Sequence, residues 1–317
     1  MQGSARVSVT PIADESLGVR SMALFVETPD VRILFDAGVS LGPLRYSLPP
    51  HPEEFRALRK LRLKVLEYAE KAEVITISHY HRDHFTPPYP SLYECTEEKT
   101  FLEIYYGKTL LAKSPRSKIN YNQKKRAFSL QKALEKANAN ARMVFFDSET
   151  LRLGDTVVEG FLAPHGEEKL GWVLCFKVYR SGEPVLVFLP DVQGPVSQEA
   201  LRVLLTGGFK IAVIGGPPIY LSRKESSERI EEGMKNLARA LEVERLNILS
   251  HHILRDPDWR SVLDLYAPKA KFSLYSEIAG FEATLLEAYR NVLYEEDPPE
   301  PSYLKGLREK TLSCSDF

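Results

Sequence analysis

The sequence predicts an α/β fold with two similar halves, each a β-sheet covered by helices on its outer side. Short apolar runs typical of strands occur along the 317-residue chain, and segments with helical spacing separate several of them. The first half reads as hairpin, helix and strand, and the second as hairpins followed by helix–strand units. This order favours two sheets packed face to face, with helices outside.

The first half opens with an expected antiparallel hairpin. Its β-type runs span residues 22–27 and 31–35, and the turn-forming Thr28-Pro29-Asp30 lies between them. Residues 53–71 place apolar side chains at helical spacing between lysines and arginines, which predicts an amphipathic helix. The apolar run at 74–77 predicts a strand directly after that helix.

The second half is predicted as a meander of strands followed by alternating helices and strands. Ser181-Gly182 has the composition of a hairpin turn between two of the runs. The expected strands span 143–146, 157–162, 172–179, 185–189, 211–214 and 246–249, and the expected helices span 199–205 and 226–241.

Residues 94–142 differ in composition from their neighbours and follow the prolines Pro87, Pro88 and Pro90. We therefore expect one domain over residues 1–317 with an insertion at about 94–142. Within it, residues 108–142 carry ten basic side chains and one acidic one, a charge of +9. Because the whole chain has a net charge of −1, the remainder sums to −10.

Bulk composition excludes several classes of protein. The net charge gives no global attraction to nucleic acid or to an anionic membrane. Three cysteines are too few for a disulfide framework, so we expect them to be unpaired in a reducing compartment. Residues 1–20 do not resemble a signal peptide, and no apolar run is long enough to span a membrane. These features favour a cytoplasmic location.

The segment His79-Tyr80-His81-Arg82-Asp83-His84 carries the strongest chemical signal. His79 and His81 follow an apolar strand and lie two residues apart, so in an extended backbone their rings project to the same side. Asp83 and His84 can turn toward a second position. The segment therefore predicts ligands for two metal ions, and each catalytic ion needs about three protein ligands, so others must come from elsewhere.

Further candidate ligands stand at the ends of other predicted strands. His165 follows one apolar run, and Asp191 follows another, where an unpaired buried carboxylate would be costly and a metal would compensate it. His251 and His252 follow a third run. Only one of these two histidines is expected to face the metals, and the sequence leaves open which.

The order of these motifs resembles the metallo-beta-lactamase superfamily. Its members carry an aspartate after an early strand, a His-x-His-x-Asp-His segment, and then a histidine, an aspartate and a final histidine. This sequence has all of these elements in order, and residues 78–87, 113–126 and 251–256 further resemble an archaeal branch of predicted hydrolases. The matching elements are Asp36, the segment from His79 to His84, His165, Asp191, and His251 or His252.

The resemblance implies an αββα four-layer sandwich that holds two metal ions. Asp36 would orient a ligand histidine by a hydrogen bond, and with Asp83 and Asp191 it would complete the carboxylates of the catalytic centre. An aspartate at the bridging position resembles phosphodiesterase, nuclease and lactonase branches more than true beta-lactamases. The implied ligands are His79, His81 and His165 for one ion, Asp83, His84 and His251 for the other, and Asp191 as the bridge.

This ligand set implies hydrolysis by a hydroxide held between two divalent metal ions, which lower the pKa of their bound water toward about 7. Nitrogen and oxygen ligands without thiolate favour zinc, and the same set accepts manganese or iron.

The basic segment indicates an anionic substrate, a phosphodiester or nucleic acid being favoured. Lys124, Lys125, Arg126 and the distant Arg255 are the candidates for binding it. Against this, the lysines could belong to a solvated helical arm, and Arg255 to a surface salt bridge. The alternative enzyme is a lactonase or thioester hydrolase of a small metabolite, because the same metal centre serves acyl substrates. A redox or binding role is the third hypothesis.

Overall fold

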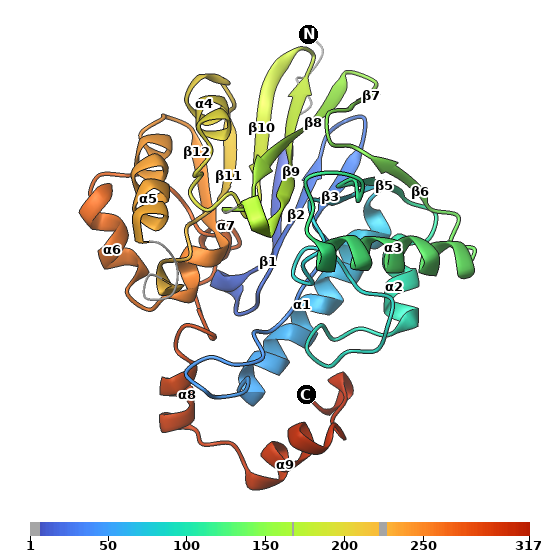
Figure 1. Ribbon diagram of the computed structural model, residues 1–317, viewed down its shortest axis with the longest axis vertical. Coiled ribbons are helices and arrows are strands. Elements are labelled where there is room, and N and C mark those ends of the chain that lie inside the picture. The colour runs from blue at the N-terminus through green and yellow to red at the C-terminus, as the bar shows by residue number, and fades with distance from the viewer. Residues whose placement is uncertain (1–6, 167, 222–226) are drawn as a thin grey trace.

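Two six-stranded β-sheets pack face to face in the described part of the chain, and helices cover the outer face of each (Figure 1). The computed structural model describes residues 7–166, 168–221 and 227–317. Across the first sheet the order is β1 (Ser8–Asp14), β2 (Met22–Glu27), β3 (Arg32–Phe35), β4 (Val74–Ile77), β5 (Thr109–Ala112) and β6 (Arg142–Phe145). Across the second it is β12 (Leu246–Ser250), β11 (Ile211–Gly215), β10 (Glu183–Leu189), β9 (Trp172–Arg180), β8 (Thr156–Pro164) and β7 (Thr150–Leu153).

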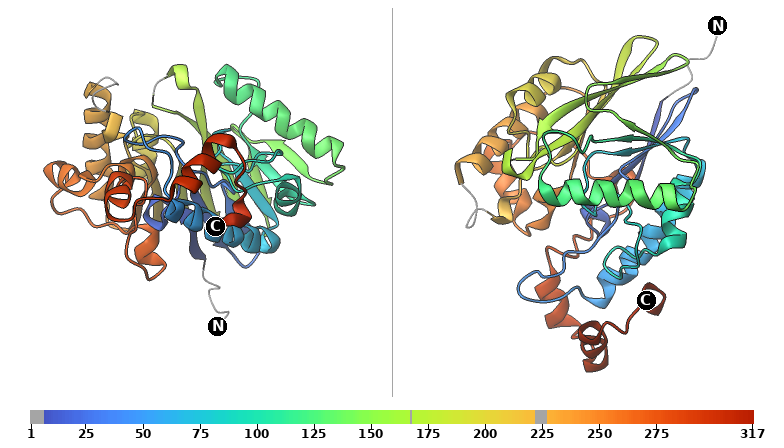
Figure 2. Two further views of the ribbon diagram at one scale, coloured as in Figure 1. Left: turned by 90° about the horizontal axis from the view of Figure 1, so that it is seen from below. Right: turned by 45° about the vertical axis from the view of Figure 1, so that its right-hand side comes forward.

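Helices on the outer faces of the two sheets form two outer layers (Figure 2). Apolar side chains of α1 (Pro52–Lys71), α2 (Glu98–Tyr105) and α3 (Tyr121–Lys136) pack on the first sheet. Those of α4 (Gln198–Thr206), α5 (Ser227–Leu241) and α6 (Trp259–Tyr266) pack on the second. The short α7 (Tyr275–Ile278), α8 (Arg290–Glu296) and α9 (Pro301–Glu309) follow. No helix among the described residues is both long and apolar enough to cross a membrane.

Side chains alternate between the two faces of each sheet, and together they form three apolar layers. On β2, Leu24 and Val26 point into the core between the sheets, whereas Ala23 and Phe25 point toward the helices. Side chains of neighbouring residues in a strand lie on opposite faces, so a strand that is buried on both faces is apolar throughout. Both sheets have this pattern, which confirms the predicted αββα sandwich.

Most elements expected from the sequence are present with small changes at their ends. The hairpin is β2–β3, with Leu24 opposite Phe35, and the predicted helix at 53–71 is α1. The side chain of His51 caps α1 by accepting a hydrogen bond from the backbone of Glu53. The predicted start of the later helix, residue 226, lies outside the described residues, as do residues 1–6 of the N-terminal stretch.

The segment predicted as an insertion, 94–142, is part of the first sheet. Its strand β5 pairs in parallel with β4 on one side and β6 on the other, and α2 and α3 are the crossover helices. The strand has only four residues and lies between basic ones, so its apolar signal was weak. One of those basic residues, Lys113, is buried and places its ammonium 2.7 Å from the carboxylate of Asp147.

The cysteines correct a second expectation. Cys95 and Cys314 form a disulfide with their Cα atoms 5.3 Å apart, although 219 residues separate them in the chain. The C-terminal segment folds back onto α1, where Phe317 stacks on Phe55 with ring centroids 4.6 Å apart. Cys175 is buried and free. No spacing rule links two cysteines so distant in sequence, so only the fold reveals the pair.

Candidate metal centre

The carboxyl ends of six strands meet at one edge of the sandwich. Strands β1 and β3 run in the same direction because each is antiparallel to β2, and β4 is parallel to β3. In the second sheet β8, β10 and β12 share a direction in the same way. Ligand sites in parallel sheets form at such edges. The residues at or just after these strand ends are Glu15, Asp36, His79, His165, Asp191 and His251.

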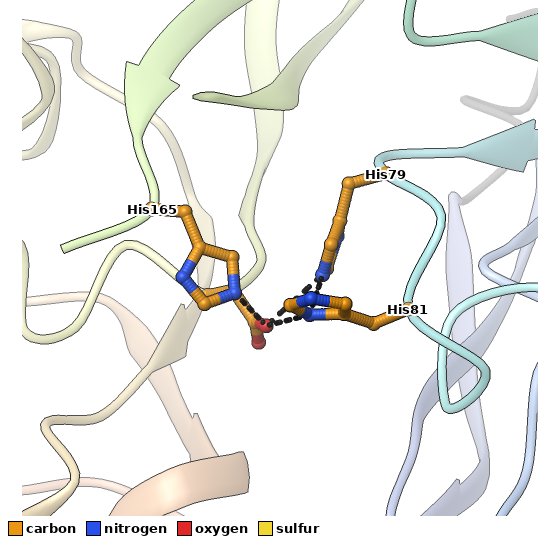
Figure 3. Close-up of side chains that lie close together, drawn as sticks. His79, His81 and His165 are labelled. Atoms are coloured by element: carbon orange, nitrogen blue, oxygen red, sulfur yellow. Dashed lines mark hydrogen bonds and ion pairs between the residues drawn. The ribbon is translucent and has the colours of Figure 1, made fainter. Parts of the chain in front are cut away.

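One group of histidines surrounds the Oδ2 atom of Asp191. His79 and His165 place their Nε2 atoms 3.1 and 2.8 Å from it, and His81 places its Nδ1 atom 3.9 Å away. Figure 3 shows His79 and His81 on the loop after β4 pointing toward His165, which follows β8. Ligand atoms of these four residues lie within 4.8 Å of one another, so the group could hold a metal ion.

A second group lies on the other side of the same carboxylate. The Nε2 atoms of His251 and His84 are 2.6 and 3.3 Å from Oδ1 of Asp191. Oδ2 of Asp83 is 3.7 Å from His251 Nε2. Asp83, His84 and His251 also bring one ligand atom each within 4.8 Å of the others. Asp191 thus stands between two clusters, with one oxygen facing each.

The polar atoms of the cluster lack the partners that buried groups ordinarily have. Both carboxylate oxygens of Asp191 and both ring nitrogens of His165 are buried without a hydrogen bond among the described residues. Their short separations are ion-pair distances without hydrogen-bond alignment. Leaving such groups unsatisfied costs about 1–3 kcal/mol each. A metal ion coordinated by these atoms would satisfy them, so the donor set fits a bound metal.

The charges of the cluster reinforce one another. Burial opposes ionisation of Asp191, but its histidine neighbours, above all His251 and His84, hold the pKa of the carboxyl well below its usual range. Burial likewise opposes the charged form of His84, but Asp191 raises its pKa well above the ordinary value. By contrast, burial and the neighbouring His84 lower the pKa of His79. The cluster therefore keeps an ionised carboxylate among imidazoles, as metal binding requires.

Asp36 does not face the cluster but holds one of its members. Its Oδ2 atom lies 2.8 Å from Nδ1 of His84, and both Ser78 and Thr76 donate to its carboxylate. The bond to Nδ1 leaves Nε2 of His84 directed at Asp191. Asp36 is therefore placed to orient the ring of His84.

Glu15 plays the corresponding part for His251, and no sequence signal pointed to it. Its Oε1 atom lies 3.1 Å from His251 Nδ1. It also accepts a 2.7 Å hydrogen bond from Nε of Arg255, whose Nη2 lies 3.1 Å from Asp83. In the sequence, Glu15 follows a run of mixed polar and apolar residues and cannot be distinguished from a solvated acid. Its role is seen only in the folded chain, where β1 places it beside His251 and Arg255.

Arg255 is placed differently from both sequence-based expectations. It was a candidate for binding an anion, with a surface salt bridge as the alternative, but its side chain is buried. Its guanidinium is engaged by the carboxylates of Glu15 and Asp83. Because those two groups already neutralise it, Arg255 fixes Asp83 and the support of His251 instead of presenting a free cation.

Both histidines after β12 reach the cluster. His251 directs Nε2 at Oδ1 of Asp191, and Nε2 of His252 lies 3.9 Å from Oδ2 of the same carboxylate. Their rings stack with centroids 4.4 Å apart. His251 belongs to two of the possible ligand groups and His252 to one. The geometry thus favours His251 as the ligand on the Asp83 side and puts His252 on the His165 side.

The three residues of α3 that the sequence suggested for substrate binding, Lys124, Lys125 and Arg126, do not all face the same way. Arg126 donates from Nη1 to the backbone oxygen of Tyr80, between the two histidines His79 and His81. Lys125 and Arg126 line a groove together with Arg82, whereas Lys124 is exposed and does not. Helix α3 therefore contacts the metal-binding loop directly.

Replacing Glu15 with glutamine should weaken metal binding by about 10- to 100-fold without unfolding the chain, because residues that orient a ligand histidine have effects of that size. The measurement is metal affinity by competition with a chromogenic chelator. Glu27→Gln, an exposed position at the end of β2, is the matched control. Equal affinities for the two variants would show that Glu15 does not support His251.

The metal-free protein should lose stability as the pH rises from 6.5 to about 9. Although burial lowers it, Asp191 and Glu15 raise the pKa of His251 to about 9, compared with 6.5 for a free histidine. The stabilisation from this proton is complete below 6.5 and is lost as the pH passes through the folded value. Burial raises the pKa of Asp14 to about 7, so its contribution is lost mostly below this pH range, between 3.8 and about 7. Thermal unfolding in EDTA should show Tm falling by on the order of 5 °C.

Metal affinity should change in the opposite sense over the same pH range. A bound ion must replace the proton of His251, so binding releases protons and becomes tighter as the pH rises. Calorimetric titration of zinc in two buffers with different ionisation enthalpies measures the protons released. A metal-free Tm that increases between these pH values, or zinc binding without proton release, would contradict the charge arrangement described above.

Comparisons with known proteins identify relatives of the chain and a solved structure with a similar fold. No protein-family model matches it. A UPF0282 protein of Pyrobaculum aerophilum is 44% identical over 304 residues, which cover 93% of this chain and 97% of the relative. A UPF0282 protein of Methanopyrus kandleri is 40% identical over 294 residues, covering 91% and 99%. Among solved structures, a metallo-beta-lactamase fold protein of Bacillus subtilis aligns with a TM-score of 0.50 at 10% identity, covering 86% of this chain and 96% of that one.

Proposed function

The chain belongs to the UPF0282 family of archaeal proteins, and on the geometry of its metal centre we propose that it is a metal-dependent hydrolase of phosphodiesters or other phosphorylated substrates. The metallo-beta-lactamase fold supplies the setting, and the residues at the strand ends supply the chemistry. Fold alone does not select a reaction, so the proposal rests on those residues.

The observation that carries the proposal is the position of Asp191. Its two buried oxygens face different groups of ligands and have no hydrogen-bond partner among the described residues. A carboxylate so placed is suited to bridge two ions. We assign His79, His81 and His165 to one ion, Asp83, His84 and His251 to the other, and Asp191 to both.

The donor set favours zinc. The clusters found in the described chain contain imidazole nitrogens and carboxylate oxygens and no cysteine sulfur. Such ligands bind zinc well and also accept manganese or iron. Two ions of this kind supply a Lewis acid for the substrate and a water that ionises near neutral pH. The protein contributes the rigid strand ends, the buried carboxylate between the ions, and the groups that hold each imidazole in position.

A phosphorylated substrate is favoured over an acyl substrate by the surroundings of the centre. Arg82 lies between the ligands His81 and Asp83, and α3 adds Lys125 and Arg126 on the same side. Guanidinium groups match the oxygens of a phosphate in geometry and charge. A lactone or thioester is neutral at its reacting group and would not need these cations.

The test combines metal analysis with a substrate panel. Protein purified without added chelator is expected to contain up to two metal ions per chain by mass spectrometry. It should hydrolyse bis(p-nitrophenyl) phosphate, lose that activity in EDTA and regain it with zinc or manganese. Chromogenic lactones and thioesters should react far more slowly. Metal-dependent turnover of the acyl substrates alone would refute the phosphodiester assignment, and failure to bind metal would refute the hydrolase proposal itself.

A further inference from the structure

A groove of about 290 Å³ lies between α3 and the loop that follows the metal-binding segment. One wall is the face of α3 that carries Asn122, Lys125, Arg126 and Ser129, at helical spacings of three and four residues. The other is formed by Phe85, Pro88 and Tyr89, and Arg82 completes the lining. A polar, cationic wall thus faces an apolar and aromatic one.

Two links join the groove to the metal centre. One is covalent, and the other is a hydrogen bond. Arg82 is the neighbour in sequence of the ligands His81 and Asp83. Arg126 donates a 3.0 Å hydrogen bond to the backbone oxygen of Tyr80, which lies between His79 and His81. A ligand in the groove would therefore contact the same loop that carries the ligands of the metals.

The cations of the groove are incompletely neutralised. Arg82 pairs with Glu94 at 3.2 Å, and its guanidinium lies 5.6 Å from the ring centre of Tyr89. Neither Lys125 nor Arg126 makes an ion pair with a carboxylate among the described residues, and Arg126 is only partly exposed. Burial and the nearby Arg82 lower the pKa of Arg126. Among the described residues, Glu94 is the one carboxylate that forms an ion pair with these three cations, and an anion would relieve their mutual repulsion.

Other basic residues of the +9 segment are engaged elsewhere. Lys108 donates to the backbone oxygens of Glu70 and Ala72, and Lys113 pairs with Asp147. Lys118 lies over the ring of Trp172 at 3.8 Å. The segment therefore does not present one continuous phosphate-binding face. Two of its ten basic residues, Lys125 and Arg126, line the groove, whose volume is at the lower end of the range of about 300–1,000 Å³ for small-molecule sites.

We propose that this groove binds a second phosphate of the substrate, together with the ring that carries it, while the scissile ester lies at the metals. The ligand class is a small nucleotide or a similar phosphate ester of a ring compound. Arg82, Lys125 and Arg126 would bind the phosphate, and Tyr89 would stack on the ring. This inference deepens the proposed function and rests on it for the identity of the reacting bond.

Binding to metal-free protein tests the groove independently of turnover. Protein dialysed free of metal and chelator is titrated calorimetrically with adenosine 3′,5′-bisphosphate, with adenosine as the reference lacking phosphate. Lys125→Ala should weaken binding of the bisphosphate by about tenfold, the effect of one charge-assisted hydrogen bond. Lys124→Ala is the matched control, because this neighbouring lysine has the same charge on the same helix but does not line the groove. It should bind like the wild type.

Cleavage by the metal-loaded enzyme tests the link to the reaction. Thymidine 5′-(p-nitrophenyl phosphate) is compared with the same compound carrying a 3′-phosphate. The wild type and Lys124→Ala should prefer the second compound by about tenfold in kcat/KM, and Lys125→Ala should lose that preference. Absence of turnover with both compounds would count against the proposed function. The calorimetric comparison would still show whether the groove binds the phosphate.

Two results would overturn the inference. Equal bisphosphate affinities for the Lys124 and Lys125 variants would show that the groove does not bind the phosphate. Alternatively, affinity for single-stranded oligonucleotides could increase steadily with length and fall equally in both variants, with a steep salt dependence. That outcome would identify an extended nucleic-acid surface in place of a site for one phosphate.

Discussion

Asp191→Asn is expected to lower kcat by roughly 100- to 1,000-fold, the range found when one preorganised electrostatic group is removed from an active site. The substitution keeps the size of the side chain but removes the charge that faces both groups of ligands. Asp191 has a φ of 47°, a left-handed conformation that asparagine also adopts readily. The backbone at the end of β10 should therefore be retained, and if the proposed two-ion assignment holds, metal content should fall from two ions toward one.

Circular dichroism and metal analysis must accompany the kinetics of this variant. Asp155→Asn, which alters an exposed carboxylate paired with Arg180, controls for the substitution itself. An unfolded Asp191→Asn protein would mean that the carboxylate is chiefly structural. A folded variant with undiminished hydrolysis would show that Asp191 does not bridge the ions.

Arg290→Ala is expected to destabilise the fold by about 3–5 kcal/mol, because it leaves a buried carboxylate without its partner. Arg290 is fully buried and binds both oxygens of Glu54 at 2.8 Å. It also donates to the backbone oxygens of Gly42 and Leu48. The pair joins α8 to the first turn of α1, so its loss should weaken the packing of α8, although the Cys95–Cys314 disulfide still holds the C-terminal segment.

Chemical unfolding of three variants separates this effect from simple loss of packing. The double variant Glu54→Gln/Arg290→Met removes both charges and should be markedly more stable than Arg290→Ala. Arg32→Ala breaks the exposed pair with Glu73 and should cost less than about 1 kcal/mol. An Arg290→Ala protein as stable as Arg32→Ala would contradict the importance assigned to the buried pair.

The parts of the fold that could be predicted from the sequence are those whose pattern is local. The hairpin β2–β3, helix α1 and strand β4 each have apolar spacing that survives without tertiary context. Strand β1 was missed because Pro11 and Asp14 interrupt its apolar residues, and Asp14 is buried among Ser16 and Ser250 only after folding. The C-terminal helices α8 and α9 were likewise not anticipated.

The residues of the site also differ in whether a local sequence pattern predicts them. The spacing from His79 to His84 indicates metal binding by itself, and His165, Asp191 and His251 were found because each follows an apolar run. Glu15 has no such mark, and the partners of Arg255 lie 240 and 172 residues away in sequence. Long-range pairs of charges leave no periodic trace, so their roles became visible only in three dimensions.

The division of the ligands between the sheets has a mechanical consequence. The first sheet contributes only the residues of the loop after β4, and the second contributes those after β8, β10 and β12. In the ligand assignment proposed above, neither sheet alone supplies three ligands for either ion. An ion held in that way would be a reversible crosslink between the two halves of the chain, and the two sheets could not separate there without releasing it. If the backbone were cut between β6 and β7, the two pieces would each carry an incomplete site, and a metal ion would favour their reassociation.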